Sequence, residues 1–132
     1  MVAWWPGVVP TGRVSGAVWS FADVLPTLAE IGGGGVPEGV DGSSVVGALK
    51  GGDLEERFLY WEFFERGFQQ AARRGKWKVV RPRAGAKLEL YDLEADVGEE
   101  TDLAEENGEV IEAFEAWMAG ARTESAAWPV GG

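Results

Sequence analysis

The sequence QQAARRGKWKVVR, residues 69–81, predicts two strands joined by a tight turn. Arg and Lys are interleaved with Ala, Trp and Val on the two sides of Arg74-Gly75-Lys76, as expected for strands with one dry and one wet face. A glycine in so short a connection is typical of a β-hairpin. The pattern therefore predicts an antiparallel sheet that covers a core with one face.

Two further segments on either side of the hairpin also have a period of two. Residues 58–63 read FLYWEF, and residues 87–93 read KLELYDL. Each is short and rich in aromatic or branched residues, as strands are. Together with the hairpin they predict a four-stranded antiparallel sheet.

A helix is predicted after the sheet, from the cap residue Asn107 to Arg122 in its last turn. Its apolar residues recur at helical spacing and form one stripe: Val110, Ile111, Phe114, Trp117, Met118 and Ala121. We expect this stripe to pack on the dry face of the sheet, which makes the fold class α+β. A groove for a cofactor or partner is the alternative interpretation of the stripe.

The first part of the chain predicts an extended arm and two short helices. Residues 2–19 are broken by prolines and glycines, and Val2–Trp5 reads as a short apolar strand. A helix is predicted over residues 20–31, and a second, shorter helix follows residues 41–43. Gly51-Gly52 closes the second helix, and the period of two begins at Phe58.

The composition excludes several classes of function. The net charge of −10 disfavours nucleic-acid binding, which depends on Lys and Arg. Without Cys or His the chain contains neither a thiolate site nor a Ser-His-Asp triad. No apolar run is long enough for a membrane span, and residues 1–6 do not resemble a signal peptide, so the compartment stays open.

The acidic loop after Asp92 invites a calcium-binding interpretation, which its spacing does not support. Counted from Asp92, Gly98 is the seventh residue and Leu103 the twelfth, whereas an EF-hand loop needs glycine sixth and an acid twelfth. A solvated acidic loop is therefore favoured, and we predict no metal site.

The seven tryptophans suggest a sugar-stacking surface, but without regular spacing a core or interface role is favoured.

The stretch LYWEFFERGF, residues 59–68, places a carboxylate between aromatic residues. Glu62 and Gln70 would face a shared space if their strands are neighbours, and Arg73 is a candidate anion ligand. With Glu65 these residues form the candidate substrate-binding set, at the wall of a pocket. An ordinary solvated sheet face is the alternative.

Several stretches, in this order, resemble the C-terminal part of sulfatases of the arylsulfatase and N-sulphoglucosamine sulphohydrolase type. They are WWPGVVPTGRVSG (4–16), DVLPTLAEIGG (23–33), VPEGVDGSSVVGALKG (36–51), LYWEF (59–63), QQAARRGKWKVVR (69–81), ELYDLEADVGEETDLA (89–104) and ARTES (121–125). The resemblance covers nearly the whole chain.

The resemblance implies an alkaline-phosphatase-like α/β enzyme that hydrolyses sulfuric esters or sulfamates with a formylglycine and a bound calcium. Residues 1–52 would be a remnant of the large domain, and residues 53–132 the C-terminal subdomain. The formylglycine motif C-x-P-S-R is absent from this sequence. We therefore expect no catalytic residue here, no activity of the chain alone, and an N-terminal catalytic domain as partner.

The resemblance also implies a place near the substrate pocket for the strand LYWEF. Relatives often have a His and a Glu after it, where this chain has Phe64 and Glu65, and often Gly-Gly where it has Gly67-Phe68. The expected substrate of the full enzyme is a sulfated glycan or aryl sulfate, and family members are often exported. The alternative function is a stand-alone binding module for a glycan or a protein.

Overall fold

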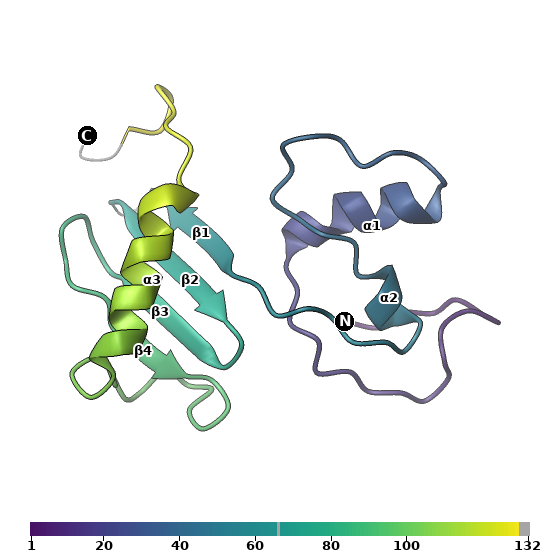
Figure 1. Cartoon of the computed structure of the whole chain (residues 1–132), viewed down its shortest axis with the longest axis horizontal. Helices are drawn as coiled ribbons and strands as arrows, with labels where there is room; N and C mark the ends of the chain where they lie inside the picture. The colour runs from purple at the N-terminus through teal and green to yellow at the C-terminus, as the bar shows by residue number, and fades with distance from the viewer. Residues whose placement is uncertain (66, 130–132) are drawn as a thin grey trace. The chain divides into compact units, whose positions relative to one another are not determined.

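The computed structural model describes residues 1–65 and 67–129, and the chain divides into two compact units, Met1–Glu56 and Arg57–Gly132 (Figure 1). The first unit contains the short 3-10 helix η1, Phe21–Asp23, and the helices α1, Val24–Ile31, and α2, Val46–Leu49. The second contains a sheet and the helix α3, Gly108–Ala121. The assignment of residues 1–52 and 53–132 to two sulfatase domains stays a prediction.

The sheet has four antiparallel strands in the order β1-β2-β3-β4, as predicted. Their bounds are β1 Leu59–Phe63, β2 Gln69–Arg74, β3 Trp77–Arg81 and β4 Glu89–Asp92. Between β2 and β3 the chain turns through Gly75, whose φ of 56° is a conformation that glycine adopts without strain. Consecutive strands are therefore neighbours throughout.

Helix α3 lies across one face of the sheet (Figure 1), and the core forms between these two layers. One row across this face joins Tyr60, Ala72, Val79 and Leu90 as successive strand partners. The buried core residues are Ala72, Val79, Leu88, Leu90, Phe114 and Met118. Fully burying each of the larger side chains stabilises the fold by about 1.5–3 kcal/mol. The α+β class predicted from the apolar stripe is confirmed.

Aromatic contacts join the start of β1 to the middle of α3. The rings of Phe58 and Trp117 are stacked with centroids 4.4 Å apart. Phe58 also meets the edge of Phe114 at 5.1 Å. Such pairs add to the free energy of burial and favour one packing geometry over others.

Two details at the ends of α3 differ from the prediction. Asn107 occupies the cap position, but its side-chain amide donates to the carbonyl of Leu103 at 3.0 Å instead of capping the helix. Arg122 lies just past the helix with extended backbone, at φ −86° and ψ 133°. Its side chain is therefore available for contacts outside the last turn.

The predicted strand at Val2–Trp5 is wrong, because the structure assigns no strand to residues 1–19. The chain turns at Pro6-Gly7, where Gly7 has a φ of 76°, and the amides of Val8 and Val9 bond back to the carbonyl of Trp5. The apolar residues of Val2–Trp5 are compatible with a strand, but a strand also needs a neighbouring strand that pairs with its backbone N–H and C=O groups. The described residues provide none for this segment.

A buried carboxylate holds the first unit together. Asp23 is fully buried and accepts hydrogen bonds from the amides of Ser20 and Ser43, both at 2.8 Å. One turn later, the Thr27 hydroxyl donates to the Asp23 carbonyl and accepts from the amide of Val45. The D-x-x-P-T stretch thus fastens the segment 43–45 to α1.

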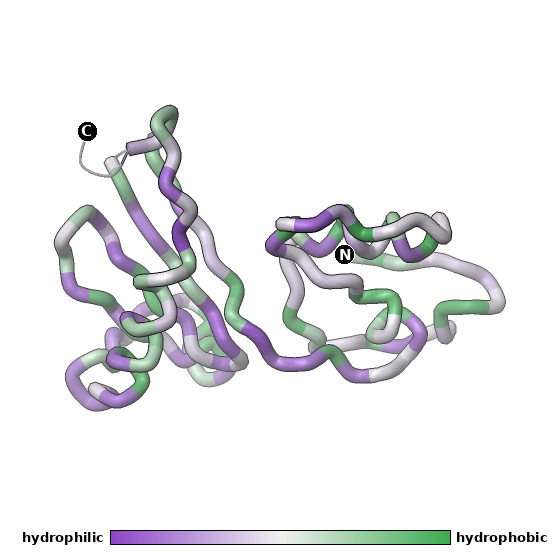
Figure 2. The backbone as a smooth tube through the Cα atoms, turned by 45° about the horizontal axis from the view of Figure 1, so that its top comes forward, coloured by the Kyte–Doolittle hydropathy of each residue, from purple (hydrophilic) through white to green (hydrophobic). Residues whose placement is uncertain are grey.

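Within the described residues, no helix is long and apolar enough to cross a membrane. Figure 2 shows hydrophobic positions distributed along both units instead of gathered in one segment.

Candidate functional site

A polar network lies at one end of the helix-covered sheet face, built from Tyr60, Glu62, Gln70, Arg81 and Arg122. Glu62 and Gln70 are direct cross-strand partners. The Tyr60 hydroxyl donates to Glu62 Oε1 at 2.6 Å and accepts from Gln70 Nε2 at 2.6 Å. Arg81 Nε donates to Gln70 Oε1 at 3.0 Å. The period of two places these side chains on one face, where they satisfy one another.

Arg122 joins this network from the segment after α3. Its Nε forms an ion pair with Glu62 Oε1 at 3.1 Å, and its Nη1 pairs with Glu124 at 2.5 Å. Its Nη2 donates to the carbonyl of Trp128 at 2.6 Å. The guanidinium also lies 5.9 Å from the ring centroid of Phe68. The ion pair with Glu124 is the main cause that raises the pKa of Arg122 above its ordinary value.

Tyr60 is a neutral donor in this network. The pKa of the Tyr60 hydroxyl is raised from 10 to about 12. Burial is the largest cause, and the hydrogen bond to Glu62 is the second. At neutral pH the phenol therefore stays protonated and bonds the carboxylate. Through this bond the neutral phenol orients the Glu62 carboxylate.

The β1–β2 connection, here residues 64–65 and 67–68, lies beside the network. Phe64 contacts Phe68 at 5.2 Å and Trp128 at 5.4 Å between ring centroids. Gly67 has a φ of 92°, which favours glycine, and Glu65 is exposed. Glu65 is thus the candidate residue whose carboxylate faces water.

The structure brings Glu62 and Gln70 together but places Arg73 elsewhere. Arg73 pairs with Leu59 and Lys78, in a row on the opposite face of the sheet, and its Nε donates to the carbonyl of Gly75 at 3.0 Å. The expected grouping of Arg73 with the other two is therefore wrong. Arg73 follows Gln70 on β2 by three positions, and an odd offset along a strand places two side chains on opposite faces.

Sequence reasoning missed three members of the network: Tyr60, Arg81 and Arg122. The register would have found Arg81, because it aligns Glu62, Gln70 and Arg81 in one row. The period of two would have found Tyr60, which lies two residues before Glu62 on the same face of β1. Arg122 carried no such signal. Its position depends on how the chain leaves the helix.

The acidic loop after β4 uses its carboxylates within the fold. Asp92 pairs with Lys76 at 2.6 Å, and this hydrogen bond is the main reason that the pKa of Asp92 is lowered. Glu99 pairs with Lys78, and Asp96 and Asp102 accept backbone amides. Across residues 1–65 and 67–129 no group of three or more acidic side chains could hold a metal ion. The described residues thus do not fit a calcium site.

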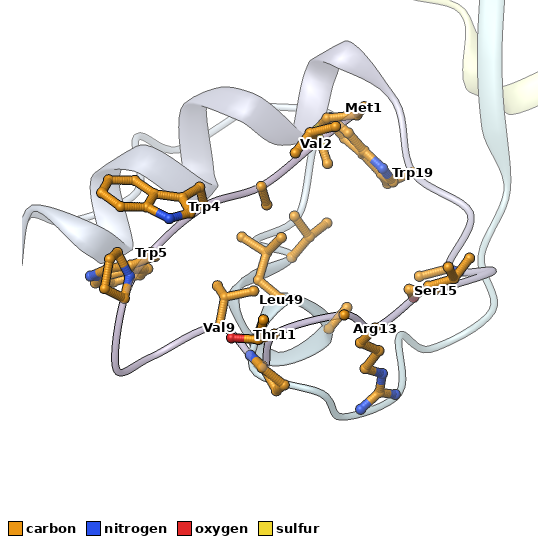
Figure 3. Close-up of a pocket in the computed structure, with 18 of the residues that line it drawn as sticks. Met1, Val2, Trp4, Trp5, Val9, Thr11, Arg13, Ser15, Trp19 and Leu49 are labelled. Carbon is orange, nitrogen blue, oxygen red and sulfur yellow. The ribbon is translucent and has the colours of Figure 1, made fainter.

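The first unit encloses a hollow of about 740 Å³ between its N-terminal arm and α2 (Figure 3). Trp4, Trp5, Val9 and Leu49 are among its mainly apolar lining, and Arg13 bonds the carbonyl of Gly51 at its margin. Trp4 is 85% exposed. The sugar-stacking interpretation of these tryptophans stays a hypothesis.

Comparisons with known proteins identify relatives of the chain, although no family model matches it. A choline-sulfatase from Rhizobium meliloti is 36% identical over 105 residues, which are 76% of this chain and 20% of that protein. An ulvan-active sulfatase from Formosa agariphila is 46% identical over 54 residues, or 41% of this chain and 11% of that protein. This chain is similar to the C-terminal region of sulfatases.

The sulfatase resemblance extends to structure. A crystal structure of a sulfatase from Bacteroides thetaiotaomicron, called putative in its description, matches 74% of this chain and 23% of its own, with 25% identity and a TM-score of 0.63. The α+β fold of this sulfatase-like chain is therefore that of a sulfatase C-terminal subdomain. The chain spans only 11% and 20% of the length of the two sulfatases compared above.

Proposed function

We propose that this chain serves as the C-terminal part of a sulfatase that hydrolyses sulfuric esters or sulfamates. The observation that carries the proposal is the match to choline-sulfatase, which is 36% identical over 105 residues yet covers only 20% of that enzyme. In this role the chain supports the enzyme and contributes to the rim of its substrate pocket. The catalytic residues come from an N-terminal catalytic domain.

The chemistry of sulfate-ester hydrolysis supports a catalytic site that lies in the partner domain and not in this chain. The reaction class needs an activated nucleophile and a cation that stabilises developing negative charge. The sequence has no Cys, no His and no formylglycine motif of the C-x-P-S-R form. Formylglycine therefore fits no motif of this sequence, and no group of acidic side chains within residues 1–65 and 67–129 could hold a calcium ion. In this proposal both belong to the partner domain.

The rim is proposed to be the β1–β2 connection. Glu65 is exposed there, while Glu62 and Gln70 lie in the network behind it. A carboxylate repels a sulfate group but accepts hydrogen bonds from hydroxyls, so Glu65 would bind the sugar part of a sulfated glycan. Arg73 lies on the other sheet face and is left out of this rim.

The partner domain would cover apolar side chains of the first unit. Phe21 is 93% exposed, Trp4 85% and Leu28 61%. Large exposed apolar residues gathered in one unit are typical of an interaction surface. The same observation supports the second candidate function, a non-catalytic module that binds another protein.

The isolated chain provides the first test. We expect the purified protein not to hydrolyse 4-nitrophenyl sulfate, with or without added calcium, because it contains no nucleophile of the required kind. Turnover that is abolished by a substitution within this chain would overturn the proposal. A sulfatase of known activity, assayed in parallel, is the positive control.

A further inference from the structure

We propose that Arg122 is a positioning residue that fixes the C-terminal segment, residues 122–129, against the β1–β2 connection. In that role it sets the shape of the proposed rim, and this part of the inference rests on the proposed function. The segment begins where α3 ends and the backbone becomes extended. Only 10% of the Arg122 side chain is exposed, so its charge is held among protein groups.

The guanidinium meets three separate pieces of the second unit. It pairs with Glu62 on β1, bonds Glu124 and the Trp128 carbonyl of its own segment, and lies near the ring of Phe68. A largely buried cation is tolerated only when such partners compensate for lost hydration. Loss of the largely buried partner Glu62, which is 18% exposed, therefore affects the position of the other groups, whereas water can replace Glu124, which is 85% exposed.

The requirement is for arginine and not merely for positive charge. Guanidinium is planar and spreads its charge over three nitrogens in fixed directions, so it pairs with two carboxylates and donates to a carbonyl at once. Lysine offers a single ammonium group at the end of a flexible chain. Arg122→Lys would keep the charge but lose the simultaneous contacts.

Aromatic contacts link the position of the β1–β2 connection to Arg122. Phe64 lies between Phe68 and Trp128, with centroid distances of 5.2 and 5.4 Å. Trp128 is held through its carbonyl by Arg122. Release of the C-terminal segment would thus remove one of the two aromatic neighbours of Phe64 and expose the connection.

The inference is tested by limited chymotrypsin digestion of the whole chain under native conditions, with cleavage sites read by mass spectrometry. We expect Arg122→Lys to speed cleavage after Phe64 and Phe68 roughly tenfold, because loss of charge-assisted bonds raises the local open population. Cleavage after the core residue Phe114 should stay within about twofold. A merely structural role would accelerate all three sites together.

Two further variants complete the test. Glu62→Gln removes the carboxylate charge that Arg122 pairs with on β1 and should reproduce the selective effect, even if Arg122→Lys fails to fold. Glu124→Gln is the matched control, because Glu124 is 85% exposed and its loss should change cleavage less than about twofold. Parallel acceleration at Phe114, or no selective effect in either Arg122→Lys or Glu62→Gln, would overturn the inference. The digestion needs no turnover, so failure of the sulfatase proposal would be seen separately.

Discussion

At the scale of single residues, two phenols make the stability of the second unit depend on alkaline pH. Burial, with hydrogen bonds to Glu62 and Glu89, raises the pKa of Tyr60 and of Tyr91 to about 12. The unfolded chain, with an ordinary pKa near 10, loses these protons first. The stabilisation is therefore complete below about pH 10 and is lost as the pH rises toward 12.

We predict that the free energy of unfolding, measured in urea, falls between about pH 10 and 12. The fall should be shallower in the variant Tyr60→Phe/Tyr91→Phe, which removes both tyrosines of the chain. An identical slope in the two proteins would contradict the assignment.

A second residue-scale prediction concerns Gly42. A Cβ atom at this position would lie 1.9 Å from the carbonyl oxygen of Ala22, so the backbone would have to move. Gly42→Ala should destabilise the first unit by about 1–3 kcal/mol, as overpacking does. Faster hydrogen exchange in peptides of residues 20–49 would show the loss.

The matched control is Gly47→Ala in α2, where nothing lies within 4 Å of the added carbon. Alanine favours a helix over glycine by about 0.5–1 kcal/mol, so this change should be neutral or stabilising. Equal effects of Gly42→Ala and Gly47→Ala on hydrogen exchange would contradict the claim that contact with Ala22 requires glycine at position 42.

At the scale of elements, the packing of α3 on the sheet is the main source of stability in the second unit. Phe114 is 3% exposed and meets Phe58 edge-on. We predict that Phe114→Ala lowers the free energy of unfolding by about 3–5 kcal/mol. Glu112→Ala, on the exposed side of the same helix, should change it by less than about 0.5 kcal/mol. An unchanged urea midpoint for Phe114→Ala would be incompatible with the packing described.

The sequence predicts these elements well because their hydrophobic periods are local. The four strands and α3 lie within two residues of their predicted bounds. Two features that depend on distant partners differ from the prediction. Arg122 was assigned to the helix end, although its side chain reaches β1, and Val2–Trp5 was assigned to a strand without a neighbour.

The candidate site was predictable to the same limited degree. Strand adjacency correctly paired Glu62 with Gln70. Alternation along β2 should have excluded Arg73 from that face, since three residues of offset reverse the side-chain direction. The bonds from Tyr60 and Arg122 to Glu62 depend on register and on the path after α3, which a local pattern does not contain.

At the scale of the whole molecule, the two units have separate interiors. The hollow of the first unit is lined by residues 1–49, whereas the α3–sheet core lies within residues 58–118. We predict that deletion of residues 1–12 leaves the second unit folded, with unchanged hydrogen-exchange protection in β2, β3 and α3. Loss of that protection would show that the arm belongs to the core.

The proposed function requires this chain to act with a catalytic domain, as the C-terminal part of a sulfatase. The most direct measurement is the sulfatase activity of a chimaera in which the 105-residue matching region of choline-sulfatase is replaced by this chain. We expect the chimaera to hydrolyse its sulfate ester measurably faster than the same enzyme truncated before that region. A soluble, folded chimaera no more active than the truncated enzyme, beside a fully active parent, would contradict it.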